Sequence, residues 1–285
     1  MPEISVIVPC FNQAEYLKDS IGSILAQTFE DWECIIVNDG STDNTEEIAL
    51  AYCSVDNRFL YIKKENGGPS SSKNIGIRQS KGNFIQFLDA DDVIDKNKFE
   101  IQIAQLKNTS PYALSYCDYF ASIDSDLSIP YPKRYMNPRF KSENYLLELI
   151  RNWEFSMSIP CHCYLFKSEI FKEKNIFFDE KLMNHEDWDC WMSIFSHNPE
   201  VYFIDQILAT YRIQENSVCF NIDLMYNGFL KALSKQKEMQ KKNSMALHLL
   251  SIKYFQVKYG GKYIYKVLVK GLSIYTKILL LLKQI

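Results

Sequence analysis

The chain has 285 residues, a hydrophobic fraction of 47% and a formal net charge of -3. This length allows one large domain or two small ones with a buried core. Because there is no basic excess, nucleic acid is not a favoured partner. The N-terminus Met1-Pro2-Glu3 carries neither a cationic lead nor an apolar run of the signal type. We therefore expect a protein that is not exported and stays in the cytoplasm.

Eight cysteines are scattered along the chain, most of them in apolar segments where a free thiol packs as a small hydrophobe. In a reducing compartment we expect them to be free. The run Cys161-His162-Cys163 suggests zinc, but no second pair stands at a structural-zinc spacing. Buried thiols are the favoured interpretation.

The first 90 residues alternate between strand and helix patterns, which is typical of a parallel, doubly wound sheet. Apolar runs predict strands at residues 4–9, 33–38, 59–62 and 84–88. Helices are predicted between them: one opening at Asn12 or Gln13, one after a capping box at residues 43–46 and running to about Tyr52, and one over residues 70–79.

Asp89, Asp91 and Asp92 follow the fourth predicted strand directly. Open α/β sheets bind ligands at this carboxyl edge, and carboxylates so close together repel one another unless water or a cation lies between them. Mg²⁺ or Mn²⁺ takes such oxygens, and Mg²⁺ usually keeps coordination positions for substrate phosphates. The alternative is a solvated turn that caps a helix starting near Lys96. This stretch alone leaves both interpretations open.

Other loops are expected at the same edge, carrying Phe11, Asp39 and residues 66–72. The pair Gly67-Gly68, with neighbouring hydroxyls and amides, can cradle phosphate oxygens. Neither GxGxxG after the first strand nor GxxxxGK[ST] anywhere is present. Dinucleotide and P-loop sites are therefore poorly supported.

From residue 111 to about 212 the alternation is lost. Strands are predicted at 113–119 and 201–211, a helix at 143–151, and loop over most of 123–141. A further helix carries Glu186 and Asp187 at its start and an apolar face behind them. These acids either complement the helix N-terminus or supply a general base that faces the metal site. Arg212 places a fixed cation after the last predicted strand.

The chain is predicted to be helical from about Asp223. Residues 263–285 hold no twenty-residue run free of charge, so they do not predict a membrane span. On a helical wheel one stripe is basic and most of the rest is apolar; the stripe comprises Lys266, Lys270, Ser273 and Lys277. This pattern favours a basic amphipathic helix on an anionic membrane surface, with docking on protein as the alternative.

Five motifs, taken in order, resemble those of family 2 glycosyltransferases with the GT-A fold. They are Val8-Pro9-Cys10-Phe11-Asn12, Val37-Asn38-Asp39-Gly40-Ser41, Asn66-Gly67-Gly68-Pro69 through Lys73-Asn74-Ile75-Gly76, Leu88-Asp89-Ala90-Asp91-Asp92 and His185-Glu186-Asp187-Trp188-Asp189. The resemblance implies an α/β fold with a Rossmann-like, mostly parallel central sheet flanked by helices. It implies a GT-A domain over residues 1–217, with a nucleotide-binding half (1–110) and an acceptor-binding half (111–217). Residues 218–285 would form a C-terminal helical region with a basic amphipathic tail.

The resemblance also implies roles for single residues. Pro9 and Phe11 would line the base pocket, and Asp39 would contact the base. Asp89 would lie at the ribose and metal side, and Asp91 would ligate Mn²⁺ or Mg²⁺. The remaining residues expected at the donor are Asn12, Asn66, Lys73 and Arg212.

At the acceptor, Asp187 would be the catalytic base and Glu186 its neighbour. The chain departs from the family pattern at Lys73, where arginine is common, at Gln214, where many members have histidine, and at Ser193, where arginine is frequent. A lysine keeps the charge of an arginine but loses its bidentate fork.

The resemblance implies an inverting, metal-dependent transfer from a UDP-hexose or UDP-N-acetylhexosamine to a hydroxyl of a lipid-linked or cell-surface glycan, at the inner face of a membrane. One carboxylate base suits inversion, whereas retention by double displacement needs a second, nucleophilic carboxylate. One alternative is a sugar nucleotidyltransferase, but that class carries a Gly-rich basic loop where this chain has residues 9–13. The other is a non-catalytic carbohydrate-binding protein on the same fold, which the intact acids disfavour.

Overall fold

The computed structural model describes the chain except residues 124–125, 131–135, 215–216, 218, 220 and 270–285. Its strands are β1 (Ile4–Cys10), β2 (Trp32–Asn38), β3 (Phe59–Lys63), β4 (Phe84–Phe87), β5 (Val93–Ile94), β6 (Ala113–Ile123), β7 (Asp126–Pro130), β8 (Tyr164–Lys167) and β9 (Glu200–Ile213). Its helices are α1 (Leu17–Leu25), α2 (Thr45–Val55), α3 (Pro69–Gln79), α4 (Lys98–Leu106), α5 (Tyr145–Asn152), the 3₁₀ turn η1 (Cys161–Cys163), α6 (Glu169–Lys172), α7 (Glu186–Phe195), α8 (Ile222–Met239) and α9 (Ser244–Val269).

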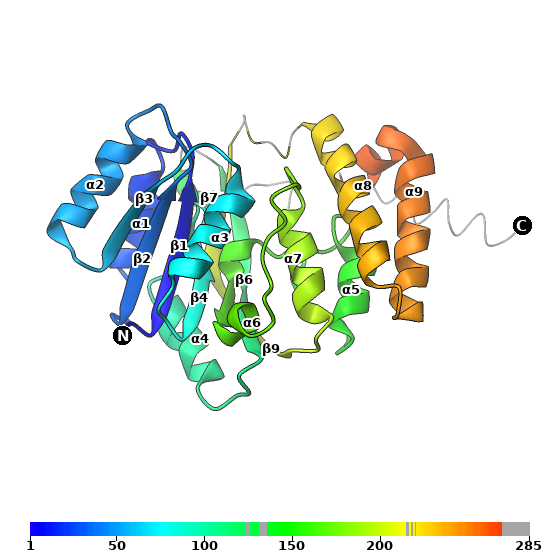
Figure 1. The fold of residues 1–285 in the computed structure, drawn as a ribbon, viewed down its shortest axis with the longest axis horizontal. Helices are drawn as coiled ribbons and strands as arrows, with labels where there is room; N and C mark the ends of the chain where they lie inside the picture. Colours follow the sequence, from blue (N-terminus) through cyan, green and yellow to red (C-terminus); the bar gives the residue numbers. More distant parts are fainter. Residues whose placement is uncertain (124–125, 131–135, 215–216, 218, 220, 270–285) are drawn as a thin grey trace, which may run out of the picture.

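The strands form one mixed sheet in the order β3-β2-β1-β4-β8-β6-β9-β5, with β7 paired to β6. Strands β3, β2, β1 and β4 are parallel, and β8 joins β4 in the antiparallel sense. The carboxyl ends of the four parallel strands therefore lie together, at the edge opposite the N-terminus in Figure 1. This architecture confirms the predicted α/β fold with a mostly parallel central sheet flanked by helices.

Helices cover both faces of the sheet because successive strand residues point to opposite sides. In β1, Val6 belongs to a buried cluster that also contains side chains of α1, α2 and α4. Its neighbour Ile7 belongs to a second cluster with side chains of α3 and of α5 to α9. The acids described below thus sit at the rim of a sheet that is packed on both faces.

Two parts of the chain differ from the sequence prediction. The segment 123–141, expected to be mostly loop, contains β7, and β6 runs on to Ile123. Helix α1 begins at Leu17 rather than at Asn12 or Gln13. Asn12 has a left-handed φ of 53°, which a right-handed α-helix does not contain. The backbone amides of Asn12 and Gln13 donate to Ser41 Oγ and to Thr45 Oγ1, at the start of α2.

The C-terminal helices α8 and α9 stand beside α7 and α5 at the far end from α2 (Figure 1). Their buried side chains, among them Phe229, Leu233 and Leu250, belong to the same apolar cluster as Trp188 and Trp191 of α7. Within the described residues, no helix combines the length and apolar character needed to cross a bilayer. The predicted basic amphipathic helix, 263–285, falls mostly outside the described residues.

Candidate active site

The acids after β4 lie where the sequence predicts, at the carboxyl end of a buried strand. The amide of Leu88 still donates to Ile7 O of β1, at 3.0 Å, and the chain then leaves the sheet. Strand β5 follows and pairs with β9. The alternative in which these acids cap the next helix is wrong, because α4 starts only at Lys98, after β5.

Asp91 is held between β9 and its own loop. Gln214 Nε2 donates to Asp91 Oδ2 at 2.8 Å, and Arg212 Nε donates to the Asp91 carbonyl at 2.7 Å. Burial, together with the nearby charges of Asp92 and Asp89, raises the pKa of the Asp91 carboxyl well above its usual value. A carboxylate in this state gains from a cation placed against it.

Asp92 has a supporting role instead. It is almost fully buried, its Oδ2 lies 2.8 Å from His162 Nδ1, and its Oδ1 accepts from the Arg212 amide at 2.8 Å. The ring of Tyr211 lies parallel to that of His162, with centroids 6.4 Å apart. Asp92 therefore fastens the acidic turn to η1 and β9 and is not free to bind a ligand.

Arg212, which the resemblance predicts near the diphosphate, contacts the same turn. Its side chain is buried, Nη2 donates to Asp19 Oδ2 of α1 at 2.6 Å, and the guanidinium lies 4.8 Å from the ring centre of Tyr16. Arg212 thus connects α1, the acidic turn and β9.

Lys73 brings the two groups of predicted site acids together. Its Nζ, on α3, lies 3.8 Å from Asp89 Oδ1 and 3.3 Å from Glu186 Oε1. Burial alone would lower the pKa of Lys73, but Asp89 and Glu186 outweigh it and raise the pKa well above its usual value. Burial would also raise the pKa of Asp89, yet Lys73 and the Cys161 thiol, 3.1 Å away, lower it. Lys73 is therefore a buried cation shared by the donor side and the acceptor side.

Asp187 follows Glu186 in the first turn of α7. Burial and the neighbouring Glu186 raise the pKa of the Asp187 carboxyl to about 6, against the opposing effects of Lys73 and His185. Its Oδ1 accepts a hydrogen bond from the Trp188 amide at 2.6 Å. A base needs a pKa near the working pH to accept a proton efficiently, and Asp187 has one.

Asp39 organises the glycine loop between β3 and α3. Its two oxygens accept from the amides of Gly67 and Gly68 at 2.9 and 2.7 Å, and Lys64 Nζ pairs with Oδ1. Gly68 has a φ of 87°, a left-handed conformation that favours glycine. The carboxylate predicted to contact the base thus also fixes the loop predicted to meet phosphate.

The remaining predicted donor residues lie at the end of β1, in the loop that follows it and in the β3–α3 loop. Pro9 is buried in β1, and Phe11 just beyond it is 45% exposed. Asn12, with a φ of 53°, accepts from the Thr42 amide through Oδ1 at 2.8 Å. Asn66 is exposed in the β3–α3 loop. Phe11 and Asn66 are thus available to a ligand, whereas Asn12 ties two loops together.

A hard divalent cation fits the chemistry of this edge. Asp89 and Asp91 present carboxylate oxygens, which suit Mg²⁺ and Mn²⁺. Gln214 faces Asp91 with its Nε2, a hydrogen-bond donor rather than an oxygen ligand. The described residues contain no cluster of three or more His, Cys, Asp or Glu side chains at ligating distance. Substrate oxygens would therefore complete the coordination.

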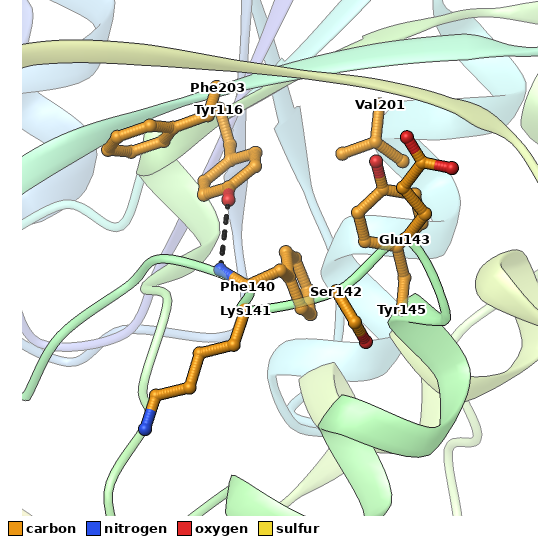
Figure 2. Close-up of a pocket in the computed structure, with 8 residues that line it drawn as sticks. All are labelled: Tyr116, Phe140, Lys141, Ser142, Glu143, Tyr145, Val201 and Phe203. Atoms are coloured by element: carbon orange, nitrogen blue, oxygen red, sulfur yellow. Dashed lines mark hydrogen bonds between the residues drawn. The ribbon is translucent and has the colours of Figure 1, made fainter.

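A separate hollow lies at the other end of α7. Figure 2 shows its aromatic lining, with the rings of Tyr116, Phe140 and Phe203 below β6 and β9. Phe140 packs on Phe195, the last residue of α7, with ring centroids 5.5 Å apart. Eight residues of helix, about 12 Å, separate Phe195 from Asp187. This hollow is therefore distinct from the acidic site.

Several site residues were missed by sequence reasoning. Asp19, His162 and Cys161 each contact a predicted site residue from a distant element. The Cys161-His162-Cys163 run was noted only for metal binding. All eight cysteines are free thiols, and six of them are buried. In the sequence, His162 is marked only by its position within an otherwise apolar segment.

Three comparisons agree with this geometry. Residues 5–173 match the family model described as "Glycosyl transferase family 2". An uncharacterized glycosyltransferase of Rickettsia typhi is 34% identical over 91% of this chain and 81% of its own. One of Methanocaldococcus jannaschii is 29% identical over 98% of this chain and 89% of its own.

Solved structures show the same fold. Staphylococcus aureus TarS 1–349 in complex with UDP has a TM-score of 0.63 at 19% identity, over 94% of this chain and 70% of that one. The mannosyltransferase PcManGT of Pyrobaculum calidifontis, in complex with GDP-Man and Mn²⁺, has a TM-score of 0.62 at 14% identity, over 99% and 81%. With the matched family model and the placement of the acids, the chain belongs to glycosyltransferase family 2.

Proposed function

We propose that the chain transfers a sugar from a nucleoside-diphosphate donor to a hydroxyl group with inversion, using a UDP-hexose or UDP-N-acetylhexosamine. The proposal is carried by the position of Lys73, whose ammonium group lies against both Asp89 after β4 and Glu186 at the start of α7. A donor held at Asp89 and Asp91 is thereby placed next to the base Asp187.

Asp187 performs the proton transfer in this scheme. It takes the proton of the acceptor hydroxyl as the oxygen attacks the anomeric carbon and the diphosphate leaves from the opposite face. Glu186 is paired with Lys73 at 3.3 Å, which reduces its power as a nucleophile. A mechanism with one carboxylate base fits inversion, whereas retention by double displacement needs a second, nucleophilic carboxylate at the anomeric carbon.

The leaving diphosphate needs positive charge. Mn²⁺ or Mg²⁺ bound at Asp91 and Asp89 would supply a Lewis acid there. Arg212 and Lys73 are two buried cations that contact the acidic turn, Arg212 at the Asp91 carbonyl and Lys73 at the Asp89 carboxylate. The PcManGT structure contains Mn²⁺, which supports the same assignment here.

Two donor nucleotides are supported by the structural neighbours. TarS structures contain UDP and UDP-GlcNAc, which supports UDP, whereas PcManGT contains GDP-Man and favours GDP as the second candidate. A thermal-shift screen of UDP-, GDP- and dTDP-sugars with Mn²⁺, followed by nucleotide-release assays, decides between them. Stabilisation by no sugar nucleotide would contradict the proposal.

For the acceptor we propose a lipid-linked or cell-surface glycan reached from an anionic membrane surface. The support is the basic stripe of residues 263–285, with Lys266, Lys270 and Lys277 on one side of an apolar segment. Co-sedimentation of the full chain and of a 1–262 truncation with anionic vesicles tests this. Equal sedimentation of the two proteins would reject the membrane contact.

A further inference from the structure

We propose that helices α8 and α9 belong to the catalytic apparatus, because they hold His185 as a positioning residue that orients Glu186 and Asp187. This inference rests on the proposed transferase function. It concerns a part of the chain beyond residues 5–173, the region that matches the family model.

The backbone at His185 is in an unfavourable conformation. It has a φ of 58° and ψ of 17° and immediately precedes Glu186, the first residue of α7. A non-glycine residue in this left-handed region costs on the order of 1–2 kcal/mol. Such a residue persists where its surroundings hold it, and it is typical of functional sites. The conformation of His185 sets the direction in which α7 starts, and thus where the Asp187 carboxylate points.

The His185 ring is held on both edges and one face. Nδ1 lies 2.7 Å from Asn184 Oδ1, and Nε2 lies 3.2 Å from Glu154 Oε1. The ring stacks on Phe229 of α8, with centroids 4.7 Å apart and planes 22° from parallel. The side chain is only 1% exposed.

Helix α8 holds the turn through its backbone. Asn184 Nδ2 donates to Leu224 O at 3.0 Å, which turns Asn184 Oδ1 toward His185. One helical turn later, at Gly228, a Cβ atom would lie 1.6 Å from Asn184 Oδ1. Glycine is therefore required at this position for α8 to approach the turn so closely.

Helix α9 holds Glu154, the partner of His185. Lys253 Nζ, on a side chain that is almost fully buried, donates to the carbonyl of Trp153 at 2.8 Å. It also lies 5.4 Å from the ring centre of Phe229. Glu154 itself has a φ of 68°. His185 and Glu154, which both have a positive φ, are thus held in contact by α8 and α9, respectively.

The arrangement acts on Asp187 in two ways. It fixes the first turn of α7, and the His185 ring lowers the pKa of Asp187 against the effects of burial and Glu186. Lys73 acts in the same direction as His185. Loss of the ring contacts should therefore reduce turnover while leaving nucleotide binding unchanged, because the proposed donor residues lie on β1, on the loops after β1 to β4, on α3 and on β9.

The test compares Gly228→Ala with Gly22→Ala in the full chain. Gly22 is also in a helix, but a Cβ there meets nothing within 4 Å. We expect Gly228→Ala to speed amide exchange in residues 184–190 at least tenfold and to lower kcat about 10- to 100-fold. UDP affinity with Mn²⁺ and the KM for the donor should stay within about twofold, and Gly22→Ala should match the wild type in every measurement. Wild-type exchange and kcat in Gly228→Ala would overturn the proposal.

If Gly228→Ala also loses UDP affinity, a general loss of folding is the cause, and His185→Asn decides. Asparagine tolerates the left-handed conformation but is too short to reach Glu154. For His185→Asn we expect a reduced kcat and the UDP affinity of the wild type. In its pH profile of kcat, the decline on the acidic side should move to higher pH. A wild-type kcat and a wild-type pH profile would overturn the proposal. Amide exchange needs no substrate, so an inactive wild-type protein would contradict the proposed function alone.

Discussion

The ammonium group of Lys73 lies 3.3 Å from Glu186 Oε1 and joins two helices that are 113 positions apart in the sequence. Helix α3 carries the lysine beneath the glycine loop, and α7 carries the glutamate beside the proposed base. Asp89 lies against the same ammonium at 3.8 Å. This one cation therefore connects the acidic turn after β4 with the acidic start of α7.

Removing Lys73 should destabilise the protein. Lys73→Ala leaves Glu186 and Asp89 without their shared partner, and breaking a buried ion pair costs 3–5 kcal/mol. Because the Asp89 side chain is 37% exposed, water can solvate it, and we expect the lower end, about 3 kcal/mol. Urea unfolding measures this. Lys63→Ala, which breaks an exposed pair with Glu46, is the matched control and should leave the midpoint unchanged; equal effects in the two variants would contradict the role of Lys73.

Turnover should fall in acid as Asp187 is protonated. Since the pKa of Asp187 is about 6, kcat should be constant at higher pH and decline with unit slope as the pH falls through that value. The charges that set this value are those of Glu186, Lys73 and His185. The pH profile of kcat under saturating substrates provides the measurement. In Asp187→Asn the transfer should drop by at least 100-fold, and an undiminished rate would remove Asp187 from the role of base.

The Asp187 carboxylate should lower the free energy of unfolding at neutral pH. Its folded pKa is raised, so between about pH 4, the ordinary value for Asp, and about pH 6 the folded state binds more protons than the unfolded state. Stability from this group is therefore present at low pH and lost as the pH rises through that window. We expect Asp187→Asn to raise the free energy of unfolding at pH 7 by up to about 3 kcal/mol. An unchanged free energy of unfolding in Asp187→Asn at pH 7 would mean that burial and Glu186 do not destabilise the charged form of Asp187.

Asp39 should matter for the loop as well as for the nucleotide. Asp39→Ala frees the amides of Gly67 and Gly68, and each lost bond to a charged acceptor costs roughly 1.5–3 kcal/mol. We expect faster amide exchange at residues 66–68 together with weaker UDP binding. Weaker binding with unchanged exchange would restrict Asp39 to direct contact with the base.

The regular half of the fold was predictable because its signals are local. The apolar runs that became β1 to β4 are short and bounded by turn residues, and the acids after β4 stand out by charge alone. The position of Glu186 and Asp187 at the start of a predicted helix indicated a possible general base, whereas a site role for Lys73 followed only from the family resemblance. In the structure Lys73 pairs with Glu186 and lowers the pKa of Asp187.

The elements that were predicted wrongly depend on contacts between segments that are distant in the sequence. Strand β7 exists because it pairs with β6, in a stretch whose prolines favour loop. Helix α1 starts at Leu17 rather than at Asn12 or Gln13, since Asn12 has a left-handed φ of 53°. The amides of Asn12 and Gln13 donate to side chains of Ser41 and Thr45, about thirty positions away. The His185–Glu154 contact joins residues that are far apart in the sequence, and no local sequence pattern predicts it.

Calorimetric titration with UDP, in the presence and absence of Mn²⁺, tests the central claim most directly because it needs no acceptor. We expect Mn²⁺ to tighten UDP binding to the wild-type chain at least tenfold, a gain of about 1.4 kcal/mol. Asp91→Ala should lose that gain entirely, whereas Asp187→Asn should keep it. An unaltered gain in Asp91→Ala, or no gain in the wild type, would contradict the assignment of the metal and the diphosphate to the acids that follow β4.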